Sequence, residues 1–125
     1  MRMYELTSWR EENTDVSLII RWSRTARTRV LEIDDWLRER SPEAADRFTD
    51  VLFEKLELLA EHPYLAQVYM VLQDPSIRRQ VVGKYIVFYY VDQAKQTIHI
   101  LTVRHGRQPR PTGEELLEIL EEPDR

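Results

Sequence analysis

The sequence predicts an α+β fold in which an antiparallel helical hairpin packs on one face of an antiparallel sheet. Three observations lead to this prediction. Apolar residues recur with helical spacing in two successive stretches, a serine–proline pair separates those stretches, and three β-rich runs follow in the second half of the chain. A chain of 125 residues is long enough to build one hydrophobic core, so we expect a single domain.

Composition narrows the class of protein. With 42% hydrophobic and 32% charged residues, the chain is typical of a soluble globular protein. It has no cysteine, which excludes disulfides, a thiolate nucleophile and a cysteine-built zinc site. No apolar run approaches the ~20 residues needed to span a bilayer, and no signal segment is recognisable at the N-terminus. We therefore expect a cytoplasmic protein without a membrane partner.

The first half of the chain predicts one strand and two helices. Residues 17–22 are β-branched or aromatic in character and predict a strand, and residues 25–39 carry an apolar stripe that predicts a helix. Ser41 is a suitable N-cap, Pro42 a suitable first helical residue, and Pro63 ends the second helix. The short connection makes the two helices antiparallel. The stripes consist of Ala26, Val30, Ile33 and Leu37, and of Ala45, Phe48, Leu52, Leu56 and Leu59.

The second half predicts a three-stranded antiparallel meander over residues 77–82, 85–91 and 97–104. Residues 65–72 fit either a loop or a short edge strand. The middle run is apolar on both parities, so one set, either Ile86, Phe88 and Tyr90 or Val87, Tyr89 and Val91, should pack against the helices. We expect the opposite face of the sheet to be free for function.

A short helix is predicted near the C-terminus. Thr112 and Glu115 have the spacing of a capping box, and apolar residues follow them directly. No internal repeat or low-complexity segment accompanies these elements.

Charge is segregated along the chain. The formal net charge is -4, yet residues 77–110 carry seven Lys or Arg against a single acid, Asp92, and are therefore strongly basic. Such a segment can act on a nearby partner while the protein as a whole stays acidic. The alternative is that these cations only solubilise an exposed face of the sheet.

Residues 77–109, which read IRRQVVGKYIVFYYVDQAKQTIHILTVRHGRQP, resemble the C-terminal half of the RelE/ParE toxin superfamily. The shared pattern comprises an arginine-bearing strand, a Gly-x-Tyr turn and a final strand that ends in histidine followed by arginine. Residues 41–63 are similar to the second helix of that superfamily. The resemblance divides the chain into an N-terminal extension (1–16), a toxin-like domain (17–109) and a C-terminal tail with the short helix (110–125).

The resemblance implies one of two activities. RelE-like members are ribosome-dependent mRNA endonucleases, whereas ParE-like members inhibit DNA gyrase by binding it, and both bind an antitoxin. RNA cleavage needs proton-transfer groups and cations around the phosphate, for which His105 and Arg107 are the candidate catalytic residues. However, Ile86 stands where RelE nucleases carry a basic residue, and residues 109–113 contain no tyrosine. His105 could equally be a structural histidine.

The pattern therefore favours a ParE-like, non-catalytic inhibitor. We expect a toxin that binds its cognate antitoxin in a hetero-oligomer and acts on gyrase, with the ribosome and its mRNA as the alternative target. A decayed toxin that keeps only antitoxin binding is a third reading. Aromatic and arginine side chains are suited to such interfaces, although the aromatic residues could instead be core. The candidate partner-binding residues are Arg78, Arg79, Lys84, Tyr85, Tyr89, Arg104 and Arg107.

Neither a cofactor nor a metal is implied. The sequence has no glycine-rich phosphate loop and no metal-ligand spacing of His, Asp and Glu. Strand alternation places His99 and His105 on one face, but too far apart along the strand to share a metal ion.

Overall fold

The computed structural model describes residues 17–123, so the expected N-terminal extension, residues 1–16, lies outside the described part of the chain. Its helices and strands follow the expected order, with one additional strand. They are β1 (Ile19–Trp22), α1 (Arg24–Arg40), α2 (Pro42–Glu61), β2 (Gln67–Val71), β3 (Ser76–Val82), β4 (Tyr85–Asp92), β5 (Thr97–His105) and α3 (Gly113–Leu120). In residues 17–123, no helix has both the length and the apolar character needed to cross a membrane.

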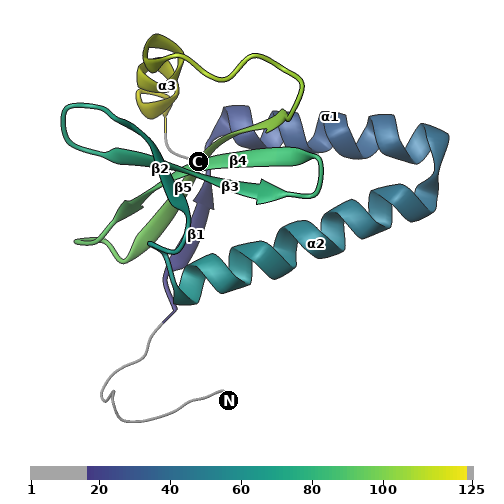
Figure 1. Cartoon of the computed structure of the whole chain (residues 1–125), viewed down its shortest axis with the longest axis horizontal. Helices are drawn as coiled ribbons and strands as arrows, with labels where there is room; N and C mark the ends of the chain where they lie inside the picture. The colour runs from purple at the N-terminus through teal and green to yellow at the C-terminus, as the bar shows by residue number, and fades with distance from the viewer. Residues whose placement is uncertain (1–16, 124–125) are drawn as a thin grey trace, which may run out of the picture.

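The two long helices form the expected antiparallel hairpin (Figure 1). Ser23 caps α1, since its hydroxyl accepts a hydrogen bond from the Ala26 N–H at 2.8 Å. Ser41 caps α2 in the same way through the Ala44 N–H at 3.2 Å, and Pro42 occupies the first turn. Because Ser41 alone separates the helices, the chain must reverse direction sharply at this point.

The sheet is mixed rather than wholly antiparallel. Its strand order is β1-β5-β4-β3-β2, and every neighbouring pair is antiparallel except β1 and β5. A parallel pair requires a long connection between its strands, which the intervening helices and strands provide here. Of the two alternatives for residues 65–72, the edge strand is confirmed, because β2 pairs with β3 at the outside of the sheet.

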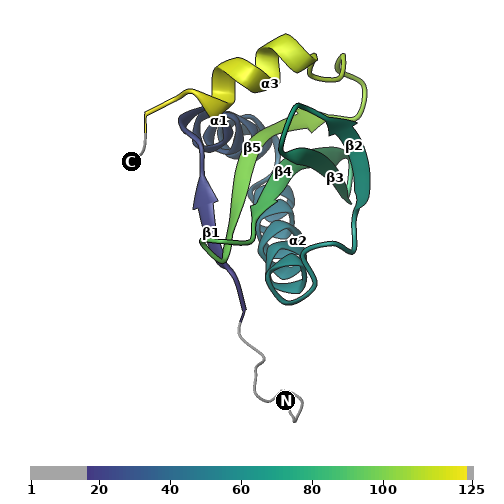
Figure 2. The ribbon, with the colours of Figure 1, turned by 90° about the vertical axis from the view of Figure 1, so that its left-hand side faces the viewer.

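Both faces of the sheet are covered, but unequally (Figure 2). The helical hairpin covers one face, where Val87 and Tyr89 of β4 pack with Leu52 and Leu56 of α2. This confirms the expected packing of one β4 parity against the hairpin. We had expected the other face to be free, and this expectation is wrong, because α3 lies across that face. Its cluster contains Ile77, Ile86, Phe88, Leu101, Leu116 and Ile119.

A β-bulge interrupts the pairing of β4 with β5. Tyr89 pairs with Ile100 and Phe88 with Thr102, so Leu101 is an extra residue in β5. The bulge reverses the alternation of side chains beyond it. Ile98 and Ile100, on either side of His99, pack in the hairpin core, whereas His105 contacts Tyr85 on the hairpin side. The expectation that His99 and His105 share a face is therefore wrong.

Candidate functional site

Several predicted site residues meet where β5 ends beside the turn between β3 and β4. Tyr85 and His105 are paired across β4 and β5, and their rings contact edge to face with centroids 5.2 Å apart. The Gly106 N–H donates a hydrogen bond to the Lys84 carbonyl at 2.8 Å, and Arg107 follows directly. Gly106 suits this close approach, since a Cβ there would lie 3.3 Å from the Lys84 oxygen. We refer to Lys84, Tyr85, His105 and Arg107 as the β5-end cluster.

The hydrogen bonds of His105 define what its ring can do. Its Nδ1 accepts a hydrogen bond from the Arg107 backbone N–H at 3.0 Å, and the His105 backbone N–H donates to Gln108 Oε1 at 2.7 Å. A neutral imidazole that accepts at Nδ1 carries its proton on Nε2. This hydrogen bond orients the His105 ring and leaves Nε2 as the ring nitrogen that can donate a proton.

Tyr85 connects this cluster to the hairpin core. Its ring lies edge to face against Phe48 of α2, with centroids 5.0 Å apart, and also contacts the His105 ring. Burial raises the pKa of the Tyr85 phenol above its usual value. Tyr85 is therefore protonated at neutral pH and can donate a hydrogen bond or a proton.

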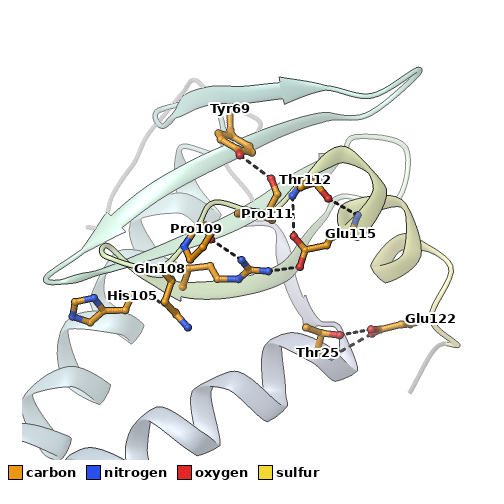
Figure 3. Close-up of polar contacts among 10 residues, drawn as sticks. Thr25, Tyr69, His105, Gln108, Pro109, Pro111, Thr112, Glu115 and Glu122 are labelled. Carbon is orange, nitrogen blue, oxygen red and sulfur yellow. Dashed lines mark hydrogen bonds and ion pairs between the residues drawn. The ribbon is translucent and has the colours of Figure 1, made fainter.

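Arg104 points to the other face of the sheet and holds α3 in place. Its guanidinium donates to Glu115 at 2.8 Å and to the Pro109 carbonyl at 2.7 Å. Glu115 also accepts from the Thr112 N–H, which completes the expected capping box (Figure 3). Hydrogen bonds from Thr112 and Arg104 hold the pKa of the Glu115 carboxyl below its ordinary value. Arg104 thus supports α3 and is only slightly accessible to a partner.

Arg78 and Arg79 lie on opposite faces of β3. Arg78 is paired with Tyr89 and donates to the carbonyls of Tyr64 and Ala66, at 3.3 and 2.6 Å. Arg79 is paired with Phe88 on the α3 face and donates to the side chain of Gln67. The two arginines therefore do not form one binding patch, and Arg78 is engaged in holding the loop before β2.

Tyr89 is a core residue. Its side chain is fully buried, and its hydroxyl donates to the Pro63 carbonyl at 2.8 Å. Burial raises the pKa of Tyr89 to about 12, although nearby Arg78 acts in the opposite direction. Of the two alternatives for this aromatic residue, the structure places it in the core, where it offers no surface to a partner.

The basic segment does not form a continuous patch. Lys95 lies in the turn before β5, at the opposite end of that strand from Arg107, while Arg104 is covered by α3. Arg110 returns to the β5 end, where it donates to the carbonyls of Gly106 and Gln108. Only Lys84, Arg107 and Arg110 gather at one end of the sheet, and all three are exposed.

The sequence did not reveal an exposed apolar surface next to β2. Tyr64, Leu65 and Val68 are between 47% and 62% exposed, and the Arg78 guanidinium lies over the Tyr64 ring at 5.0 Å. Val68 is paired with Arg78 and Gln67 with Arg79, so apolar and basic groups adjoin along this edge of the sheet. The alternation of residues 67–71 was the available signal, but it was too short to decide between loop and strand.

Comparison with known proteins agrees with this geometry. Residues 20–110 match the family model described as the ParE toxin of the type II toxin–antitoxin system, parDE. A chain of the archaeal RelE–RelB complex from Pyrococcus horikoshii is 19% identical, with a TM-score of 0.52 over 74% of this chain and 100% of that chain. At this identity the likeness shows a common fold.

A second solved structure has a lower TM-score. A chain of the toxin–antitoxin complex RelBE2 from Mycobacterium tuberculosis is 20% identical, with a TM-score of 0.48 over 72% of this chain and 99% of that chain. Curated protein sequences give no match. The family match extends over well more than half of the residues, and the chain therefore belongs to the ParE toxin family of type II toxin–antitoxin systems.

Proposed function

We propose that this toxin inhibits growth by binding DNA gyrase and that a cognate antitoxin neutralises it. The observation that carries the proposal is the environment of Ile86, the position at which a RelE-like nuclease has a basic residue. Ile86 is 4% exposed and packs with Phe88 and Leu116 beneath α3. Cleavage of a phosphodiester needs cations that reach the phosphate, and a buried aliphatic side chain cannot serve this purpose. This environment supports inhibition by binding.

The exposed β5 end is the surface that we assign to gyrase. Lys84 and Arg107 are exposed there, next to the ordered ring of His105. Exposed cations at the rim of an interface mainly guide association and contribute modestly to affinity. The β5-end cluster thus supports contact with an acidic surface of the target.

We assign the antitoxin to the β2 edge. Val68 and Leu65 supply exposed apolar area, and Arg79, paired with Gln67, supplies a positive charge on the face of this edge opposite Val68. β2 is the outer strand of the sheet, so one side of its backbone is available for pairing with an extended segment. An antitoxin segment with apolar residues and carboxylates matches this surface, and it would form the hetero-oligomer expected from the sequence.

The test of target uses purified toxin in gyrase supercoiling and in mRNA cleavage on translating ribosomes. For a gyrase inhibitor, Arg107→Ala should weaken binding and inhibition together by roughly fivefold, corresponding to about 1 kcal/mol for a rim arginine. Arg24→Ala, which removes an exposed arginine at the start of α1, is the matched control and should leave both unchanged. Full inhibition of supercoiling by the Arg107→Ala protein would contradict this placement.

The contact between Tyr85 and His105 favours one alternative, the mRNA endonuclease. Together they offer a protonated phenol and an oriented imidazole, with Lys84 and Arg107 as cations. In that case His105→Ala should lower ribosome-dependent cleavage by ~10²–10⁴ while ribosome binding persists, because proton transfer contributes about that much. That result, with gyrase unaffected, would replace the gyrase proposal.

The antitoxin assignment is tested with Arg79→Glu, since reversal of Arg78 would also release the loop carbonyls that it binds. We expect slower association with the antitoxin at low salt and a smaller difference at high salt. Arg47→Glu on the exposed side of α2 is the control of equal charge change. Equal association rates for the two variants would contradict our assignment of the antitoxin to the β2 edge. Growth arrest that the antitoxin gene relieves would distinguish an active toxin from a decayed one.

A further inference from the structure

A hollow of about 570 Å³ lies at the end of the sheet opposite the β5-end cluster. Its floor is formed by two rows of residues paired across β1, β5 and β4. One row is Arg21, His99 and Tyr90, and the other is Ile19, Thr97 and Asp92. Paired residues on adjacent strands share a face of the sheet. The end of α3 and Arg27 of α1 complete the wall.

Three cations, Arg21, Arg27 and Lys95, line this hollow. Among residues 17–123, no Asp or Glu oxygen comes within 4.0 Å of the charged groups of Arg21, Arg27 or Lys95. Two acids also line the hollow, and Asp92 Oδ2 lies 4.0 Å from His99 Nε2. Asp92 accepts from the Lys95 backbone N–H at 3.1 Å, and Glu122 accepts from the Thr25 N–H. Because three cations face these two acids, the hollow favours an anion.

Two stacked rings lie on the floor of the hollow. Tyr90 and His99 are almost parallel, at an interplanar angle of 10°, with centroids 4.6 Å apart. A planar ring extends such a stack, and bases bind to aromatic platforms in this way in many nucleic-acid-binding proteins. An anion that also carries a planar ring satisfies both features of the hollow.

We propose that this hollow binds a purine nucleoside phosphate. The base stacks on Tyr90 and His99, the phosphate lies among Arg21, Arg27 and Lys95, and Asp92 accepts from the sugar or base. The volume lies within the range of roughly 300–1,000 Å³ common for small-molecule sites. A free nucleotide and a nucleotide within a single strand share this chemistry. The site is independent of the gyrase proposal, because it uses none of the residues of the β5-end cluster.

Isothermal titration calorimetry on the full chain tests the proposal with four probes: AMP, ADP, adenosine and pyrophosphate. Both nucleotides should bind saturably, and each more tightly than adenosine or pyrophosphate, because only they occupy the stack and the cations together. Arg21→Ala should weaken ADP binding by about tenfold or more, as expected for loss of a charged hydrogen bond. Arg24→Ala is the matched control, since Arg24 is exposed but does not line the hollow.

The remaining outcomes also decide the proposal. Lys95→Ala, in an exposed turn, provides a second variant with little risk to folding, and it should weaken ADP binding as well. Absence of saturable nucleotide binding, or binding that neither variant changes, would overturn the proposal. Pyrophosphate binding as tight as that of ADP would also overturn it, because the rings would then play no part. If a short single-stranded oligoadenylate bound more tightly than ADP through the same residues, the ligand would be a nucleotide within a single strand and not a free nucleotide.

Discussion

The two faces of the sheet are built in different ways. On the hairpin face, α1 and α2 contribute long apolar stripes to one large buried cluster that includes Leu52, Leu56 and Tyr89. On the other face, the eight-residue helix α3 buries only Leu116 and Ile119. Polar contacts supplement them, from Arg104 to Glu115 near the start of α3 and from Thr25 to Glu122 beyond its end.

This difference separates global stability from local opening. A helix as short as α3 is marginal by itself and depends on its contacts with the sheet. Elements with few buried contacts open at a lower free energy than the core does. The hairpin face should therefore set the stability of the whole domain, while α3 can open from a domain that stays folded.

The largest effect should come from the hairpin core. Leu52 is 1% exposed, so Leu52→Ala should lower the free energy of unfolding by roughly 2–5 kcal/mol, through lost burial and the cavity that remains. Urea denaturation followed by circular dichroism measures this change. Leu31→Ala on α1 is the control, because Leu31 is 63% exposed and its loss should cost less than about 0.5 kcal/mol. Similar costs for both variants would contradict the assignment of the core.

Leu116→Ala should have a smaller effect, confined to the opening of α3. Leu116 is fully buried under α3, so the change should lower the free energy of local opening by about 2 kcal/mol, near the lower end for such substitutions. Hydrogen exchange of the amides in residues 113–120 reports this opening. Leu117→Ala alters the exposed neighbour and is the control. If amides of α2 and α3 lost protection equally, the two faces would unfold as one unit.

Loss of a helix cap should have a still smaller effect. Whether the cost appears in local opening or in global unfolding should depend on which face of the sheet the helix covers. Thr112→Ala removes the hydroxyl that accepts from the Glu115 N–H at 3.1 Å and should cost about 1 kcal/mol in opening of α3. Ser41→Ala removes the corresponding cap of α2, and its cost of similar size should appear in global unfolding. Hydrogen exchange in α3 and urea denaturation, measured for both variants, distinguish local opening from global unfolding. Global destabilisation by Thr112→Ala alone would reverse this assignment.

The elements that were predicted correctly have strong local signals. Helical periodicity and the Ser41–Pro42 pair defined the hairpin, and the capping box defined α3. The bulge at Leu101 had no such signal, because it depends on how β5 pairs with β4 in three dimensions. The parallel pairing of β1 and the packing of α3 on the sheet are long-range features of the same kind.

The candidate site was predicted in part for the same reason. His105 and Arg107 are near neighbours in sequence, and pairing with Tyr85 added a residue that had been considered only for partner binding. Alternation along β3 separates Arg78 from Arg79, which a list of basic residues could not reveal. Tyr89 was an ambiguous aromatic residue until its strand face was known.

The smallest effect that we predict is a dependence of α3 on pH. The pKa of Glu115 is lowered in the folded protein by hydrogen bonds from Thr112 and Arg104, so the ionised carboxylate stabilises α3. This contribution is fully present above the pKa of the unfolded chain and is lost as the pH falls through the lower, folded value. Opening of α3, measured as protection factors in residues 113–120, should therefore become easier on acidification from pH 6 to pH 3. Glu115→Gln removes this carboxylate and isolates its contribution. If that variant kept the full pH dependence, the contact between Arg104 and Glu115 would not be what holds the start of α3 to the sheet.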